Sequence, residues 1–208
     1  LFAGIIALLT AYSYAKLSKK YPENGGTVKF IHQQFGNGIF AGGINNLLWI
    51  SYIVMLALYA SAFGSYCAEL LSVTGEKNID VRIFQTSIIL IALFINYLSV
   101  KLVSEIESIA VIIKLLILLA FIGVGFYGLS IHPENLQQLS PKNWERPLLL
   151  ISGGMVIFVA YEGFELIANS ISDLKDREKN TEKAYFGAVG FVVVLYILIA
   201  IVTVGALP

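Results

Sequence analysis

The sequence predicts an all-α membrane protein, and three observations support this fold class. Of its 208 residues, 57% are apolar and only 13% are charged, whereas about a quarter of the residues in an ordinary soluble domain are charged. A soluble domain of this length could not bury so much apolar surface in one core. Charged residues are absent from long stretches, as helices that span a bilayer require. The alternating pattern that indicates membrane strands is scarce.

The composition also excludes several classes of partner and cofactor. The 14 basic and 14 acidic residues give a formal net charge of zero, so we expect no nucleic-acid partner. Cys67 is the only cysteine and can form no internal disulfide. Neither His32 nor His132 has a second His or Cys at the spacing of a metal site. We therefore expect no metal and no cofactor.

The first three helices follow from uncharged stretches, because a hydrocarbon core of ~30 Å needs about 20 helical residues. Residues 1–15 are uncharged and are followed by three lysines rather than by a cleavage site, which favours a span over a signal peptide. Residues 30–68 carry no charge, which predicts the second span. The third span lies in residues 83–100, between Arg82 and Lys101.

The last three helices follow from the second half of the chain. Residues 108–133 contain Lys114 as their only charged residue, residues 147–161 precede two glutamates, and residues 184–208 are uncharged. We therefore predict a single transmembrane domain over residues 1–208. Its six helices are expected near residues 1–17, 39–71, 83–99, 104–130, 148–171 and 184–206.

The basic residues predict the orientation of these helices. One set of alternate connections holds nine Lys and Arg residues and the other holds four, and basic connections are retained on the cytoplasmic side. The connection after the first helix, residues 17–37, is therefore expected in the cytoplasm. Because the chain begins at Leu1 within an apolar run, we expect it to be an excerpt that lacks one upstream helix.

Charged residues within the spans are candidates for function, since placing a charge at membrane depth is costly. Lys114, Glu162 and Glu165 meet this description. Two interpretations of Lys114 stay open: its stem could extend back to the cytoplasmic surface, or its ammonium group could be shielded from water and exchange a proton near neutral pH. Glu162 and Glu165 lie three residues apart, on one helical face if the helix is continuous there.

The helix near residues 148–171 is predicted to be interrupted. Gly153, Gly154 and Gly163 weaken it, and unwound backbone within a bilayer is tolerated where it is buried in protein or lines a cavity. Such a break presents free N–H and C=O groups to a zwitterionic substrate. The alternative is that these glycines allow close helix packing.

Two motifs resemble the amino acid–polyamine–organocation superfamily of secondary transporters, and the resemblance covers essentially the whole chain. Residues 21–26, followed by 35–36, are similar to the family's loop between its second and third helices. Residues 160–165, followed by 173–180 and 183–184, are similar to its broken sixth helix and the cytoplasmic loop after it. The resemblance implies a LeuT-like inverted-repeat bundle, of which this chain carries helices two to seven.

The likeness extends to archaeal proton-coupled, broad-specificity amino-acid transporters. Residues 11–17, 48–52 and 114–118 carry it. In those relatives a lysine of the fifth helix stands where sodium-coupled members bind Na⁺, and Lys114 occupies the matching position. The resemblance therefore implies that a proton is the coupling ion and that Lys114 and Glu165 are the groups whose charge changes during transport.

The resemblance also implies a substrate site at the unwound segment of the helix near residues 148–171. Polar residues in the helix near 39–71 favour contact with protein or water, so two of them join this site. The candidate substrate-binding residues are Val159, Ala160, Tyr161, Glu162, Gly163, Asn45 and Trp49. Family members usually have an apolar or small residue in place of Glu162, so its carboxylate would favour a cationic side chain or pair with a polar group elsewhere. Since the family's first helix, which completes the site, is not in the chain, we do not expect this excerpt alone to transport.

These inferences predict a secondary active amino-acid permease, multi-pass in the plasma membrane, that is proton-coupled and works by alternating access. Its expected partners are a small amino-acid substrate and the lipid bilayer, and no oligomeric state is predicted. The alternatives are an intramembrane enzyme that uses Glu162 and Glu165 as an acid and base pair, and a non-transporting membrane scaffold. No nucleophile, metal set or phosphate loop accompanies the pair, so we do not expect an enzyme.

Overall fold

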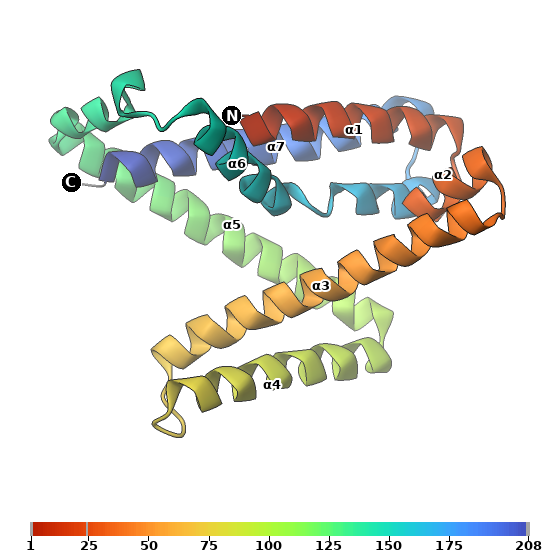
Figure 1. Ribbon diagram of the computed structural model, residues 1–208, viewed down its shortest axis with the longest axis horizontal. Coiled ribbons are helices and arrows are strands. Elements are labelled where there is room, and N and C mark those ends of the chain that lie inside the picture. Colours follow the sequence, from red (N-terminus) through yellow and green to blue (C-terminus); the bar gives the residue numbers. More distant parts are fainter. Residues whose placement is uncertain (1, 24, 207–208) are drawn as a thin grey trace. The chain divides into compact units, whose positions relative to one another are not determined.

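The computed structural model describes residues 2–23 and 25–206, and every regular element within them is helical (Figure 1). The side chains of residues 100, 102, 143, 164, 165, 172, 173 and 206 lie outside this description. The elements are α1 (Phe2–Lys20), α2 (Gly26–Phe35), α3 (Ile39–Leu70), α4 (Lys77–Leu98), α5 (Val100–Ile131), η1 (Pro133–Leu139), η2 (Pro141–Asn143), α6 (Pro147–Phe158), η3 (Val159–Tyr161), η4 (Phe164–Asp173) and α7 (Arg177–Ala206). The predicted all-α class is confirmed.

Five helical stretches of the described chain are long and apolar enough to cross a membrane. They are Ile39–Leu70, Lys77–Leu98, Val103–Ile131, Pro147–Ile171 and Arg177–Gly205. Each of them overlaps one of the predicted spans. The first predicted span corresponds to α1, which is outside this set and carries Lys19 and Lys20 in its last turn.

Two of these helices extend beyond the predicted spans at their charged ends. α4 begins at Lys77 and α7 at Arg177, where the sequence predicted starts near residues 83 and 184. In the first turn of α4, the buried carboxylate of Asp80 accepts hydrogen bonds from two backbone N–H groups of the preceding turn, at 2.9 and 3.0 Å. The absence of charge locates the hydrocarbon core and not the ends of a helix, because a helix continues where its polar groups are solvated or hydrogen-bonded.

The sequence analysis missed the ten-residue helix α2, which lies inside the expected connection of residues 17–37. The backbone reaches it through Gly25 and Gly26, whose φ angles are 124° and 49°. Glycine adopts positive φ without steric cost. The hydroxyl groups of Tyr14 on α1 and Thr27 on α2 form a hydrogen bond of 3.0 Å. A search for long uncharged stretches cannot find such a helix, because it is too short to span a bilayer.

The chain divides into two compact units. The first unit comprises Leu1–Asn37 with Leu116–Pro208, and the second comprises Gly38–Leu115. In the second unit, α3 and α4 pack along each other at Gly64, where an added Cβ would lie 2.7 Å from the carbonyl oxygen of Val81. Gln85 of α4 donates a hydrogen bond of 3.1 Å to the hydroxyl of Ser61 on α3.

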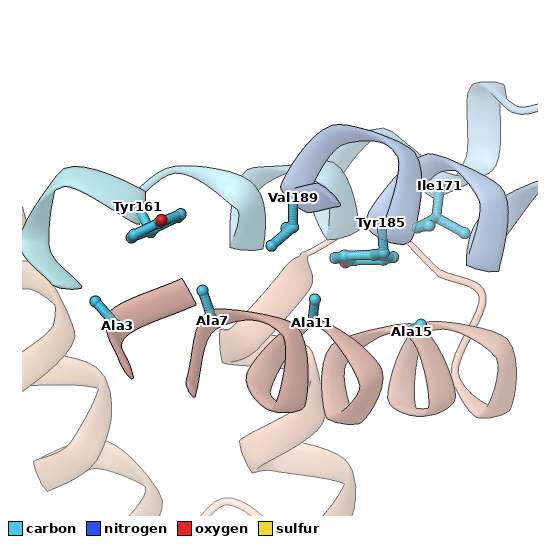
Figure 2. Close-up of a cluster of buried hydrophobic side chains, with 8 residues drawn as sticks. All are labelled: Ala3, Ala7, Ala11, Ala15, Tyr161, Ile171, Tyr185 and Val189. Atoms are coloured by element: carbon cyan, nitrogen blue, oxygen red, sulfur yellow. The ribbon is translucent and has the colours of Figure 1, made fainter. Parts of the chain in front are cut away.

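The core of the first unit lies between α1, α7 and the segment after α6. Ala3, Ala7, Ala11 and Ala15 form a stripe along one face of α1, and all four are buried. Figure 2 shows this alanine stripe facing the larger side chains of the core, which are Tyr161, Ile171, Tyr185 and Val189. Small residues at every fourth position let two helices approach closely, and this packing brings α7 against α1.

Polar contacts fix the same two helices at their charged ends. The hydroxyl groups of Ser18 on α1 and Tyr185 on α7 form a buried hydrogen bond of 3.1 Å. The carboxylate of Glu182 on α7 lies 2.8 Å from the ammonium of Lys19 and 3.4 Å from that of Lys16. The register of α1 against α7 is therefore set by specific contacts in addition to the apolar packing.

Candidate functional site

The fourth membrane-capable stretch is broken in its middle. α6 ends at Phe158, and Val159–Tyr161 form a single tighter turn. Glu162 is extended, with φ −59° and ψ 149°, and Gly163 has φ 109° and ψ −20°. The helical conformation resumes at Phe164 in η4. The predicted interruption is confirmed, and we call residues 159–163 the break.

Hydrogen bonds at the break differ from those of a continuous helix. The backbone N–H of Glu162 donates to the carbonyl of Val159 at 3.1 Å, and that of Leu166 donates to the carbonyl of Gly163 at 3.0 Å. Both bonds join residues three apart, whereas an α-helix joins residues four apart. The carbonyl of Ala160 accepts a hydrogen bond of 2.9 Å from the hydroxyl of Tyr196 on α7. Main-chain groups of the break are thus available to partners outside the helix.

Tyr161 anchors the break in the core of the first unit. Its side chain is 7% exposed and lies over Ala3 and Ala7 of α1 (Figure 2). Its ring meets that of Tyr196 edge to face, with centroids 5.0 Å apart and planes at 67°, an arrangement that aromatic pairs favour. The contacts of Tyr161 are those of a packing residue, and its predicted contact with substrate stays a prediction.

The other predicted residues of the break lie at its surface. Val159 is 41% exposed, Ala160 and Glu162 are exposed, and Gly163 is partly exposed. The backbone of Glu165 belongs to η4, but its side chain lies outside the described residues. The break therefore has one buried side, at Tyr161, and one open side on which a ligand could contact backbone and carboxylate groups.

Three predicted functional residues belong to the second unit. On α3, Asn45 is partly buried and Trp49 is 64% exposed. Lys114 lies on α5 and is exposed. The roles of these residues in substrate binding and proton coupling stay predictions. Among the described residues, no group of three His, Cys, Asp or Glu side chains could hold a metal ion.

The structure brings together two segments that the sequence analysis had treated separately. Gly26, at the start of α2, packs against Asn169 of η4 so closely that a Cβ at Gly26 would overlap the Asn169 Oδ1 atom. The last residue of the glycine-containing motif thus contacts the helix that follows the break. The sequence analysis also missed Tyr196, whose only signal is a hydroxyl group within the apolar run of residues 189–202.

The chain is similar to permeases over its whole length. Residues 1–208 match the amino acid permease family. The chain is 33% identical over 209 residues to an uncharacterized protein of Methanocaldococcus jannaschii, a match that covers 100% of this chain and 47% of that protein. It is 32% identical over 201 residues to the inner membrane transport protein YbaT of Escherichia coli, covering 97% of this chain and 46% of YbaT.

The name of a third relative states what that protein transports. The chain is 28% identical over 218 residues to the glutamate/serine transporter AimA of Bacillus subtilis, a match that covers 97% of this chain and 39% of AimA. The chain therefore spans about half the length of the curated relatives it matches.

Proposed function

The chain belongs to the amino acid permease family, and from this premise we propose that it supplies the broken-helix half of a substrate site in a secondary active amino-acid transporter. The observation that carries the proposal is the break at residues 159–163, within a stretch apolar enough to span a membrane. Unwound backbone at such a position is tolerated where it faces protein or a cavity. Secondary transporters use it to bind substrates and coupling ions.

The chemistry of the break suits a zwitterionic amino acid. Backbone carbonyls can accept hydrogen bonds from a substrate ammonium group, and N–H groups at the start of a helix can donate to a carboxylate. The exposed side of the break offers Val159, Ala160 and Glu162. The carboxylate of Glu162 would favour a substrate with a cationic side chain, whereas the name of the Bacillus relative points to glutamate and serine.

The family membership helps to decide between transport and the intramembrane enzyme that the sequence left as an alternative. The amino acid permease family and the transporter names of two relatives favour transport over catalysis, so an acid and base pair at Glu162 and Glu165 is not retained. The five apolar helices and the family make the chain a multi-pass protein of the plasma membrane. In the proposed mechanism the substrate and a proton bind at the site, and the protein alternates between inward-facing and outward-facing states. Lys114 and Glu165 are the proposed proton-coupling groups.

Uptake into liposomes tests this function in a protein of full family length that carries the chain. The probes are radiolabelled L-serine, L-glutamate, L-leucine and L-arginine, each with and without an inward proton gradient. We expect saturable uptake of at least one probe, increased by the gradient and reduced by a protonophore. Liposomes without protein are the control. Uptake that fails to saturate with every probe would contradict the transport function, and saturable uptake that ignores the gradient would contradict proton coupling alone.

A further inference from the structure

Tyr196 joins α7 to the backbone of the break by a single directional contact. Its hydroxyl donates a hydrogen bond of 2.9 Å to the carbonyl of Ala160, 36 residues earlier in the chain. In a continuous α-helix that carbonyl would accept from the backbone N–H of residue 164. The left-handed backbone of Gly163 separates the two residues. The side chain of Tyr196 therefore gives this carbonyl a donor from outside the broken stretch.

The ring of Tyr196 is held in the position that this hydrogen bond requires. It packs edge to face on Tyr161, with a centroid distance of 5.0 Å, and lies against the core cluster of the first unit. Tyr161 is itself buried between α1 and α7. The hydroxyl is thus carried by a side chain with little freedom, on a helix whose register against α1 is fixed by Ser18 and Glu182.

An unpaired backbone carbonyl is costly in a membrane protein, since lipid offers no donor. If Tyr196 did not donate, the carbonyl of Ala160 would lose this donor, and water or a shifted backbone could take its place. Val159, next to Ala160, already has an exposed side chain. Loss of the hydroxyl should therefore admit water to the break from this open side.

We propose that Tyr196 is a positioning residue that holds the break in its compact form and limits the access of water to it, through the hydrogen bond to the carbonyl of Ala160. It touches the backbone of the site from α7, while the substrate-facing side of the break stays open. The meaning of this contact for transport rests on the function proposed above, but the contact itself can be tested without any substrate.

The test measures how fast water-soluble reagent reaches a cysteine in the break. In the protein of full family length, Cys67, the only cysteine in this chain, and any cysteine outside the chain are replaced with serine, and Val159→Cys serves as the reporter. The probe is methanethiosulfonate ethyltrimethylammonium, which reacts with the hydrated thiolate. We expect Tyr196→Phe to increase the modification rate about fivefold to tenfold, which is the change in a two-state equilibrium that the loss of one hydrogen bond produces.

Two controls separate this effect from general loosening of the protein. Thr203→Val removes a hydroxyl from an exposed position of the same helix and should leave the rate at Val159→Cys unchanged. A second reporter, Met155→Cys, lies on α6 before the break and is exposed, and should react equally with and without Tyr196→Phe. An amino group in the place of the hydroxyl, introduced as p-aminophenylalanine at position 196, should restore the slow rate.

Each outcome either supports or overturns the proposal. The proposal is supported if Tyr196→Phe speeds modification at the break alone and p-aminophenylalanine reverses the effect. An unchanged rate overturns it, and so does an equal increase at both reporters. Should the Phe variant not reach the membrane, p-fluorophenylalanine at position 196 keeps the ring, lacks the donor and carries the same expectations. A failure of amino-acid uptake would overturn the proposed function and leave this result standing, because thiol modification needs no transport.

Discussion

Two glycines of the broken stretch show how a single residue determines the path of the backbone. Gly153 lies in the helical part of α6, and Gly163 has a φ of 109° at the break. An added Cβ would meet no atom within 4 Å at either position. The two residues therefore differ in backbone conformation and not in the space around them. This makes them a matched pair for measuring what the break costs.

Replacing each glycine with alanine should change stability in opposite directions. Gly163→Ala places a Cβ on a left-handed backbone, which should lower the free energy of unfolding by about 1 to 2 kcal/mol. Gly153→Ala should raise it by about 0.5 to 1 kcal/mol, because alanine favours the helix. Thermal unfolding of the purified variants in detergent measures both. Shifts of the same sign would show that Gly163 does not need its positive φ.

Glu162 is the residue whose charge should decide between classes of substrate. Glu162→Gln keeps the size of the side chain and removes the carboxylate, so uptake of L-arginine should fall relative to that of L-serine. About 1.5 to 3 kcal/mol of discrimination, or roughly a tenfold to 150-fold change in the ratio, is expected if a charged hydrogen bond is lost. Competition between the two probes in liposomes measures the ratio. An unchanged ratio would show that Glu162 does not contact the substrate side chain.

At the scale of helices, the association of α1 with α7 depends on the smallest side chains. The alanine stripe of α1 faces the tyrosines and Val189 of the core (Figure 2). Gly4 on the same helix lies so near Val193 of α7 that a Cβ would be 3.1 Å from it. Packing of this kind does not depend on a difference in polarity, since the surrounding lipid is also apolar. The complementary shapes of their facing surfaces therefore determine how α1 packs on α7.

Enlarging one alanine of the stripe should separate α1 from α7. Ala7→Leu inserts a large side chain at a position with no exposed surface, and overpacking of this kind typically costs about 1 to 3 kcal/mol. Ala188→Leu makes the same change at an exposed position of α7 and should have little effect. The loss of monodisperse protein on heating in detergent compares the two. Equal losses would show that the stripe does not set the distance between the helices.

The sequence predicted the helices and the break better than it predicted the contacts between them. Uncharged stretches and glycines are local signals, so five spans and the interruption around Gly163 could be found from them. The alanine stripe has no such signal in a chain that is apolar almost everywhere. The bond between Tyr196 and Ala160 depends on how α7 lies against α6 and the break, and α2 is too short for a rule based on bilayer thickness.

For the molecule as a whole, the chain carries about half of the length of its relatives. In transporters built from inverted repeats, the substrate site lies at the interface of the repeats and is formed by discontinuous helices, and this chain contributes one such stretch. The exposure of Lys114 and of the outer faces of α3 and α4 is an exposure within this chain alone. Tests of coupling therefore belong to the protein of full family length.

Lys114 should carry the response to protons in that protein. Lys114→Ala removes the amine, and we expect uptake to continue at a reduced rate without its dependence on the pH gradient. Lys101→Ala is the matched control, because Lys101 is an exposed lysine on the same helix, 3.9 Å from Glu105. Uptake at a series of external pH values compares the two variants with the unchanged protein. A pH dependence that survives Lys114→Ala would assign coupling to another group.

The packing of α1 on α7 also has a consequence for folding during synthesis. Ser18 and Tyr185, which bond to each other, are separated by 167 residues. At a synthesis rate of roughly 5 to 20 residues per second, α1 leaves the ribosome on the order of 10 to 30 s before its partner. Throughout that interval α1 lacks the helix on which it packs. Because α1 is less apolar than the other spans, it must be prevented from leaving the membrane or packing on another helix. Nascent chains arrested before residue 177 should therefore be the ones on which insertion factors and membrane proteases act.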